Sequence, residues 1–192
     1  MNTVKIIGYL REDFGKQFAK RLRQEAQVPG VLYGGKEQVH FYVPMSLLQP
    51  LVYTPKVNFV SLHIGEAIYR CILQDVQIHP VSEILMHLDL LEIAEDKKIK
   101  MQVPTVLVGN SPGVARGGRL VNKTRKLSVS AYPRVMPEQI AVDISGLDIG
   151  EMIRVRDIQH TDYVVLAPIE LPIASVEMTR ALKTAEMEAG KK

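Results

Sequence analysis

The chain has 192 residues, of which 46% are hydrophobic and 23% charged, so it is long enough to bury a core and too apolar to be disordered. A single cysteine, Cys71, excludes a disulfide framework and fits a reducing compartment, where we expect it to be a small buried side chain. The first residues lack the apolar core of a signal peptide, and no apolar run has the length of a membrane span. We therefore predict a soluble cytoplasmic protein.

The net charge of +3 excludes little, but the charges are sorted into blocks along the chain. Residues 1–36 contain seven Lys/Arg and three Asp/Glu, whereas residues 37–93 contain two and six. Residues 97–137 contain nine Lys/Arg and no acidic residue. A basic block suits a polyanionic partner, although a solvated charged face gives the same pattern.

The first half of the chain predicts a β structure with two helices. Residues 14–26 place Phe14, Phe18, Leu22 and Ala26 on one stripe, which predicts a helix packed through that stripe. A second, short helix is expected in SLLQPLVYT, stopped by its proline and by the proline that follows. Strand patterns bounded by turn residues cover residues 4–10, 28–33, 38–43, 57–64, 67–78 and 84–93.

The polar stretch AEDKK marks the predicted domain boundary. Beyond it, turn signals recur at strand spacing, which is typical of a small sandwich or barrel. We predict a mainly β fold with a few helices: an N-terminal domain at residues 1–93, a C-terminal mostly β domain at 94–178, and a flexible or helical tail at 179–192.

The first predicted helix carries a ridge of cationic side chains. At about 100° per residue, Lys16, Lys20 and Arg23 fall within about 60° of each other, opposite the apolar stripe. Arg21 lies at the flank of this ridge, and Arg11 lies just before the helix. Such a ridge suits a phosphate backbone, although exposed cations are common on amphipathic helices.

A turn with an aromatic residue follows the helix and the next strand. Tyr33 offers a flat face to a base and a hydroxyl to a phosphate or sugar, and Gly34 lets a backbone approach a ligand closely. An ordinary hairpin turn with a half-buried tyrosine explains the same residues. The sequence has no GxxxxGK[ST] motif, so this turn is not a phosphate-binding P-loop.

Polar residues alternate with apolar ones on two neighbouring strand patterns. Asp75, Gln77 and His79 share one predicted face of the first, and His87 and Asp89 share one face of the second. Amide, imidazole and carboxylate groups together can read base edges. Two alternatives stay open: a metal site of His79, His87 and Asp89, and a solvated sheet face without a ligand.

The chain shows no signature of catalysis. It has no nucleophile with a base at recognisable spacing, no cofactor fingerprint and no His/Cys metal cluster. The sequence therefore favours RNA binding without a cofactor, a metal or a small-molecule substrate. A protein-interaction or stress-assembly module with incidental basic patches is the alternative.

The ordered motifs GKQFAKRLR, VPGVLYGG, QDVQIHP and HLDL resemble the bacterial ribosomal protein family L twenty-five, whose long form is also called general stress protein CTC. In the second half, VPTVLVGNSPGVARGGRL and ISGLDIGEMIRVRDI are similar to segments of that long form. The resemblance implies a small β-barrel RNA-binding domain followed by a mostly β domain. It also implies binding to the loop E region of 5S ribosomal RNA in the large subunit, with neighbouring ribosomal proteins or ribosomal RNA as partners of the second domain.

The resemblance also implies which residues contact RNA. The matching positions are Arg11, Lys16, Lys20, Arg21, Arg23, Tyr33, Gln77, His87 and Asp89. We add Gly34 and His79 to these candidates from the patterns described above. The sequence departs from the family at Ile78 and Lys20, where the family often has arginine, and at Leu90, where it often has phenylalanine.

Overall fold

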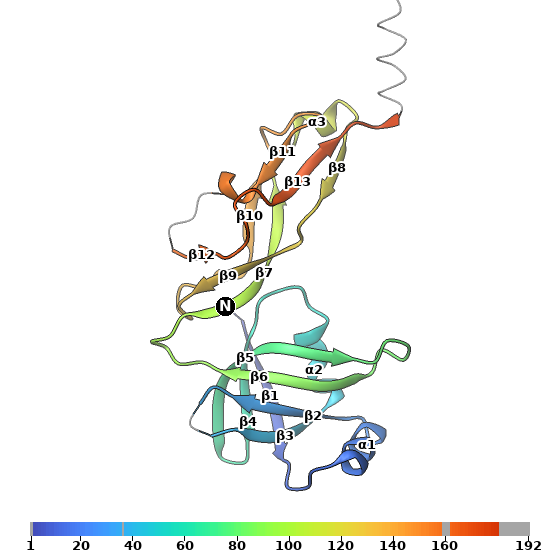
Figure 1. The fold of residues 1–192 in the computed structure, drawn as a ribbon, viewed down its shortest axis with the longest axis vertical. Helices are drawn as coiled ribbons and strands as arrows, with labels where there is room; N and C mark the ends of the chain where they lie inside the picture. Colours follow the sequence, from blue (N-terminus) through green and yellow to red (C-terminus); the bar gives the residue numbers. More distant parts are fainter. Residues whose placement is uncertain (1, 36, 159–161, 181–192) are drawn as a thin grey trace, which may run out of the picture. The chain divides into compact units, whose positions relative to one another are not determined.

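The computed structural model describes residues 2–35, 37–158 and 162–180. It divides into two compact units (Figure 1): Met1–Ile99 with Tyr132–Arg134, and Lys100–Ala131 with Val135–Lys192. Each unit contains a hydrophobic core of its own. The tail predicted at residues 179–192 lies outside the described residues except for its first two positions, and the domain boundary at 93/94 stays a prediction.

The first unit is a closed six-stranded barrel in the order β1-β3-β2-β6-β5-β4. Neighbouring strands are antiparallel except for the parallel pairs β1–β4 and β2–β6. The strands are β1 (Thr3–Leu10), β2 (Gln27–Tyr33), β3 (Val39–Pro44), β4 (Phe59–Ile64), β5 (Ala67–Ile78) and β6 (Leu85–Glu92). Two helices, α1 (Lys16–Gln24) and α2 (Met45–Val52), interrupt this series of strands.

Large apolar side chains fill the barrel because alternate residues of each strand point inward. Phe41 and Leu90 are among the side chains that are fully buried. Gly30 is required where β2 passes between its neighbours: a Cβ atom there would lie 2.8 Å from the Leu88 carbonyl oxygen and 2.8 Å from the Phe41 ring. Cys71 is also fully buried, and burial raises the pKa of its thiol to about 12, so it is the inert core residue that we expected.

Both helices of the barrel unit differ in detail from the sequence prediction. Phe14 lies before α1 and is 64% exposed, so the prediction that the helix packs through Phe14 is wrong; Leu22 is the residue of α1 that is buried. Pro50 lies inside α2 and does not stop it. The helix tolerates this proline in its last turn because Leu48 and Leu51 anchor it in the core.

The second unit contains two sheets, one of four strands in the order β10-β7-β9-β12 and one of three in the order β11-β13-β8. The strands are β7 (Ile99–Val108), β8 (Arg119–Asn122), β9 (Lys126–Ala131), β10 (Ile140–Asp143), β11 (Met152–Arg154), β12 (Val164–Val165) and β13 (Pro172–Glu177). A one-turn helix, α3 (Pro112–Ala115), and a 3-10 turn, η1 (Val155–Asp157), complete it. The prediction of a mainly β fold with few helices is confirmed. No helix in the described part of the chain is long and apolar enough to cross a membrane.

Candidate nucleic-acid interface

The polar face predicted on β5 and β6 forms on the outside of the barrel. The two strands are antiparallel neighbours, and their register places Gln77 opposite His87 and Asp75 opposite Asp89. Residues that lie opposite each other in an antiparallel pair project from the same face of the sheet. Leu88 and Leu90 are buried between these positions, so the four polar side chains point away from the core.

His79 does not belong to this face, although the alternation of the sequence predicts that it does. The register shifts between Gln77 and Ile78, and the strand ends there. The Nδ1 atom of His79 then accepts hydrogen bonds from the backbone N–H of Ser82 at 3.2 Å and from that of Val81 at 3.4 Å. His79 therefore holds the turn between β5 and β6 together.

Asp75 lies on this face, as the alternation of the sequence predicts. A second register shift, between Leu73 and Asp75, brings its carboxylate opposite that of Asp89. Like charges that face each other across two strands destabilise a sheet unless a ligand or another group offsets them. The alternation of the QDVQ segment showed the orientation of Asp75, but its partner across the sheet depends on the bulge.

His87 and Asp89 form a fixed pair on β6. The His87 Nδ1 and the Asp89 Oδ1 lie 2.6 Å apart, and both side chains are half-buried. A carboxylate can only accept a hydrogen bond, so Nδ1 carries the hydrogen, and Nε2 of the neutral ring is an acceptor. The pair therefore presents one imidazole nitrogen and the remaining carboxylate lone pairs to a ligand.

Tyr33 ends β2, which is the other neighbour of β6. Burial raises the pKa of its hydroxyl, and the negative charges of Asp89 and Asp75 raise it further. Tyr33 therefore stays a protonated hydrogen-bond donor beside the two carboxylates. Gly34 follows at φ +95, and a Cβ atom there would lie 2.6 Å from the Leu91 side chain, so the turn alone explains this glycine.

Helix α1 packs against β2, and Arg23 ties it to the polar face. The Nε–H of Arg23 donates to the backbone carbonyl of Met86 at 3.1 Å, directly beside His87. Arg23 is half-buried, so it does not point outward as the sequence predicted. Lys16 and Lys20 lie within about 60° of Arg23 around the helix and are exposed, so they project from the side of α1 that faces β6.

The two remaining cations have other partners. Arg21 forms an exposed ion pair with Glu25 at 3.0 Å, one turn along the helix. Arg11 donates from Nε to the Asp13 carbonyl at 2.8 Å, and its guanidinium lies over the rings of Phe14 and Phe18. Lys16 and Lys20, in contrast, form no ion pair with any residue that the structure describes.

The metal alternative finds no support in this geometry. Within residues 2–35, 37–158 and 162–180, no three His, Cys, Asp or Glu side chains are grouped so that they could hold a metal ion. His79 uses Nδ1 in its own turn, whereas His87 and Asp89 bond to each other.

Two of the positions where the sequence departs from the family differ in burial. Leu90 is fully buried in the core, and Ile78 is exposed beside the bulge.

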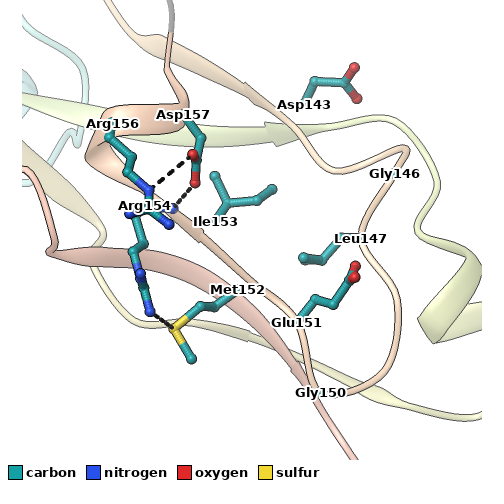
Figure 2. A pocket seen from close by; sticks show the side chains of 10 residues that line it. All are labelled: Asp143, Gly146, Leu147, Gly150, Glu151, Met152, Ile153, Arg154, Arg156 and Asp157. Atoms are coloured by element: carbon teal, nitrogen blue, oxygen red, sulfur yellow. Dashed lines mark hydrogen bonds and ion pairs between the residues drawn. The ribbon is translucent and has the colours of Figure 1, made fainter.

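The C-terminal unit contains an open hollow that is lined by charged residues and by apolar ones such as Leu147 and Ile153 (Figure 2). Arg154 and Arg156 line it, but Glu170 accepts from both guanidinium groups, at 2.8 Å and 3.0 Å. Asp157 also lies 3.5 Å from the Nε of Arg156. The two cations of this hollow are therefore neutralised within the chain and do not form a site for a polyanion.

The basic block at residues 97–137 is also partly neutralised. Arg116 pairs with Asp148 at 2.7 Å, and Lys123 pairs with Glu177 at 2.5 Å. Arg134 pairs with Glu95. These acidic partners lie outside residues 97–137. The sequence of the block therefore shows positive charges without the negative charges that neutralise some of them in the fold.

Comparisons with known proteins agree with this architecture. Residues 6–90 match the Ribosomal L25p family, and residues 98–180 match the C-terminal domain of ribosomal protein TL5. The chain is 60% identical over 189 residues to the large ribosomal subunit protein bL25 of Amoebophilus asiaticus, which covers 98% of this chain and 96% of that protein. It is 42% identical over 192 residues to bL25 of Cytophaga hutchinsonii and 36% identical over 190 residues to bL25 of Porphyromonas gingivalis, with at least 98% of each chain covered. The chain therefore belongs to the bL25 family of large ribosomal subunit proteins, in the long form that carries the TL5 C-terminal domain.

Proposed function

We propose that this chain binds 5S ribosomal RNA in the large ribosomal subunit, without catalysis, through one surface built from α1 and the outer face of β5 and β6. The bond from Arg23 to the Met86 carbonyl carries this proposal. This bond fixes the cationic side of α1 next to His87. A single ligand can therefore span the cations of the helix and the polar side chains of β5 and β6. The loop E region is the target that the family resemblance implies.

The helix side of this surface supports contacts to phosphates. Lys16 and Lys20 are exposed and project from the same side of α1 as Arg23. The Arg23 Nε is occupied by the protein, which leaves its two terminal nitrogens to donate to a phosphate. Phosphate contacts set the position of a protein on a nucleic acid and carry no sequence information directly.

The sheet side supports contacts to bases. Asp75 and Asp89 repel phosphates, but their carboxylates accept hydrogen bonds from the amino groups of bases. Gln77 can donate and accept, and Nε2 of His87 adds one more acceptor. A regular A-form duplex does not expose its base edges in the deep major groove, whereas an irregular internal loop does. The face therefore favours an irregular RNA over a regular duplex.

The proposed division between cations and polar groups has a measurable consequence. If about four cations meet phosphates, the logarithm of the binding constant falls with the logarithm of the salt concentration at a slope of about −3 to −4. The sheet contacts are made with uncharged groups or with carboxylates, so they add no counterion release. Selectivity between RNAs should therefore change less with salt than affinity does.

A gel-shift titration of the full chain tests the proposal. The RNAs are 5S ribosomal RNA and a regular duplex of the same length, each at two salt concentrations. We expect tight binding to 5S RNA, weaker binding to the duplex, and the steep salt dependence given above. Equal affinity for both RNAs, or an affinity for 5S RNA that salt does not change, would contradict the proposal.

A further inference from the structure

A strip of aromatic side chains runs along the outside of the barrel on β1 and β3 and continues onto α1. The register places Tyr9 opposite Tyr42, and the backbone N–H of Arg11 donates to the carbonyl of His40 at 2.9 Å. Residues two apart on a strand share a face, so Tyr9 and Arg11 lie beside Tyr42 and His40. We call this set the aromatic strip; its members are Tyr9, Arg11, Phe14, Phe18, His40 and Tyr42.

The aromatic strip contains two ring pairs. The rings of Tyr9 and Tyr42 stack, with centroids 5.5 Å apart and planes 24° apart. The Phe14 ring meets the His40 ring edge-on at 5.0 Å. The two ring pairs are neighbours along the sheet, since Tyr9 and Tyr42 lie two residues from Arg11 and His40.

Arg11 is fixed within this strip. Its guanidinium carbon lies 5.4 Å from the centroid of Phe14 and 5.6 Å from that of Phe18, and its Nε donates to the Asp13 carbonyl. A cation above aromatic faces is stabilised by them. These contacts restrict the Arg11 side chain before binding, which lowers the conformational entropy that a phosphate contact would cost.

Two members of the strip are open to solvent, and the other four are half-buried. Tyr9 is 51% exposed and Phe14 is 64% exposed, whereas Phe41, on the opposite face of β3, is fully buried. Contiguous exposed aromatic side chains mark interaction sites on soluble proteins. The packing of the barrel does not account for them, since the core lies on the other side of these strands.

The strip lies on the other flank of α1 from the polar face. Helix α1 packs on β2, and β2 lies between β3 and β6 in the barrel (Figure 1). Phe18 is about 140° from Arg23 around the helix, so the two side chains project to opposite sides of it. An RNA that covers α1 would therefore reach the polar face on one side and the aromatic strip on the other.

We propose that the aromatic strip is a second RNA contact, which stacks an unpaired base on Phe14 or Tyr9 while Arg11 holds the adjacent phosphate. This inference rests on the proposed function and extends it to the far flank of α1. Aromatic faces beside a fixed guanidinium are the chemistry that binds unstacked nucleotides. The exposed carboxylates of Glu12 and Asp13 beside the strip disfavour a long phosphate backbone, so the contact suits one or two unpaired nucleotides.

The test combines cross-linking with substitution in the full chain. Irradiation of the complex with 5S RNA at short ultraviolet wavelength, followed by mass spectrometry, should give cross-linked peptides that contain Tyr9, Phe14 or Tyr42. Phe14→Leu and Tyr9→Leu keep an apolar side chain but remove the stacking face, and each should raise the dissociation constant about 5-fold or more. Ile68→Ala is the matched control: it removes an apolar side chain that is 62% exposed elsewhere on the barrel, and it should leave binding unchanged.

The outcomes separate this inference from the proposed function. If the wild-type chain does not bind 5S RNA, the proposed function fails. Suppose instead that the wild-type chain binds 5S RNA and that Lys16→Ala weakens this binding. If Phe14→Leu and Tyr9→Leu then bind normally and no cross-link forms at the strip, only the second contact is overturned. Variants that bind 5S RNA normally but fail to join the large subunit would also overturn it, because the strip would then meet a protein. Equal melting temperatures for all variants show that they are folded.

Discussion

Two lysines of the barrel unit and four cations of the C-terminal unit differ in whether they form ion pairs. In the barrel unit, Lys16 and Lys20 stand on one helix and form no ion pair with a described residue. In the C-terminal unit, Arg116 and Lys123 lie against carboxylates, and Arg154 and Arg156 share Glu170. The basic block in the sequence is longest at residues 97–137, yet the cationic surface that we propose for RNA is on α1.

This difference teaches that charge blocks along a chain do not map directly onto charged surfaces. Strand pairing brings acidic residues from elsewhere in the chain next to the basic block, as Glu177 on β13 meets Lys123 just after β8. A short helix has no such cross-strand partner, and the acid that directly follows α1, Glu25, pairs with Arg21. Lys16 and Lys20 therefore stay available to a polyanion, since they form no ion pair with a residue that the structure describes.

The largest effect is expected from Lys16 and Lys20, which have no ion-pair partner among the described residues. Replacing Lys16 and Lys20 together with Ala should raise the dissociation constant for 5S RNA about 10- to 100-fold near 0.1 M salt and make the salt slope about 2 less negative, since each lysine releases about one counterion. Filter binding across a salt series measures both quantities.

The matched control removes two cations from the C-terminal unit. Arg116 and Lys123 replaced together with Ala change the net charge equally but leave α1 intact. An equal loss of slope in this variant would show that net charge, rather than the helix, drives binding.

The next effect concerns selectivity. Replacing His87 with Ala removes an acceptor of the polar face and leaves the half-buried carboxylate of Asp89 without its partner. Binding to 5S RNA should weaken by about 1–3 kcal/mol, with a much smaller change for a regular duplex. Competition between the two RNAs in one titration measures the difference.

His63 provides the control for this substitution. It is a half-buried imidazole on β4 whose Nε2 lies 3.1 Å from the Ser61 hydroxyl, away from the polar face. The selectivity of a His63→Ala chain should equal that of the wild type. If both variants lose selectivity alike, the polar face does not read bases.

A smaller effect is expected from the arginine pair of the C-terminal unit. Glu170 is 66% exposed, and ion pairs this open to solvent contribute little. Replacing Glu170 with Gln should lower the free energy of unfolding by less than about 1 kcal/mol and leave the affinity for 5S RNA unchanged. Urea unfolding followed by circular dichroism measures the first, and a gain in 5S affinity would show that the freed arginines bind RNA.

The smallest effect is a pH dependence in the C-terminal unit. The hydroxyl and the backbone N–H of Ser145 both donate to Asp143 and hold the pKa of its carboxyl below the ordinary value of 3.8. Since the folded-state pKa is depressed, this contribution to stability is present above about pH 4 and is lost as the pH falls through the folded-state value. Urea midpoints at pH 6 and pH 3 should differ less for Asp143→Asn than for the wild type, and an unchanged difference would contradict this assignment.

Most strands of the barrel could be predicted because alternation of apolar and polar residues sets their faces. The strand at residues 67–78 agrees with β5 in both bounds. Local exceptions could not be predicted, because they depend on contacts across the fold. The bulge between Gln77 and Ile78 removes His79 from the polar face, and the leucines of α2 keep Pro50 inside a helix.

The C-terminal unit was less predictable because its elements are short. The turn signals of the sequence do not reveal α3, which begins where the Ser111 hydroxyl accepts from the backbone N–H of Val114. They also do not separate β8 from β9, which are only four and six residues long. The candidate site also depends on a contact that the sequence does not predict. The helical spacing predicts that Lys16 and Lys20 lie on one side of α1, but it does not predict the hydrogen bond that turns Arg23 toward Met86.

The most direct test of the single binding surface is an NMR titration of the isotope-labelled full chain with an RNA that contains the loop E region of 5S ribosomal RNA. We predict that amide signals of α1 and of Gln77, His87 and Asp89 shift together, with the same midpoint and a stoichiometry of one RNA to one chain. Shifts confined to α1, or different midpoints for the helix and the sheet, would contradict a surface on which one RNA contacts both.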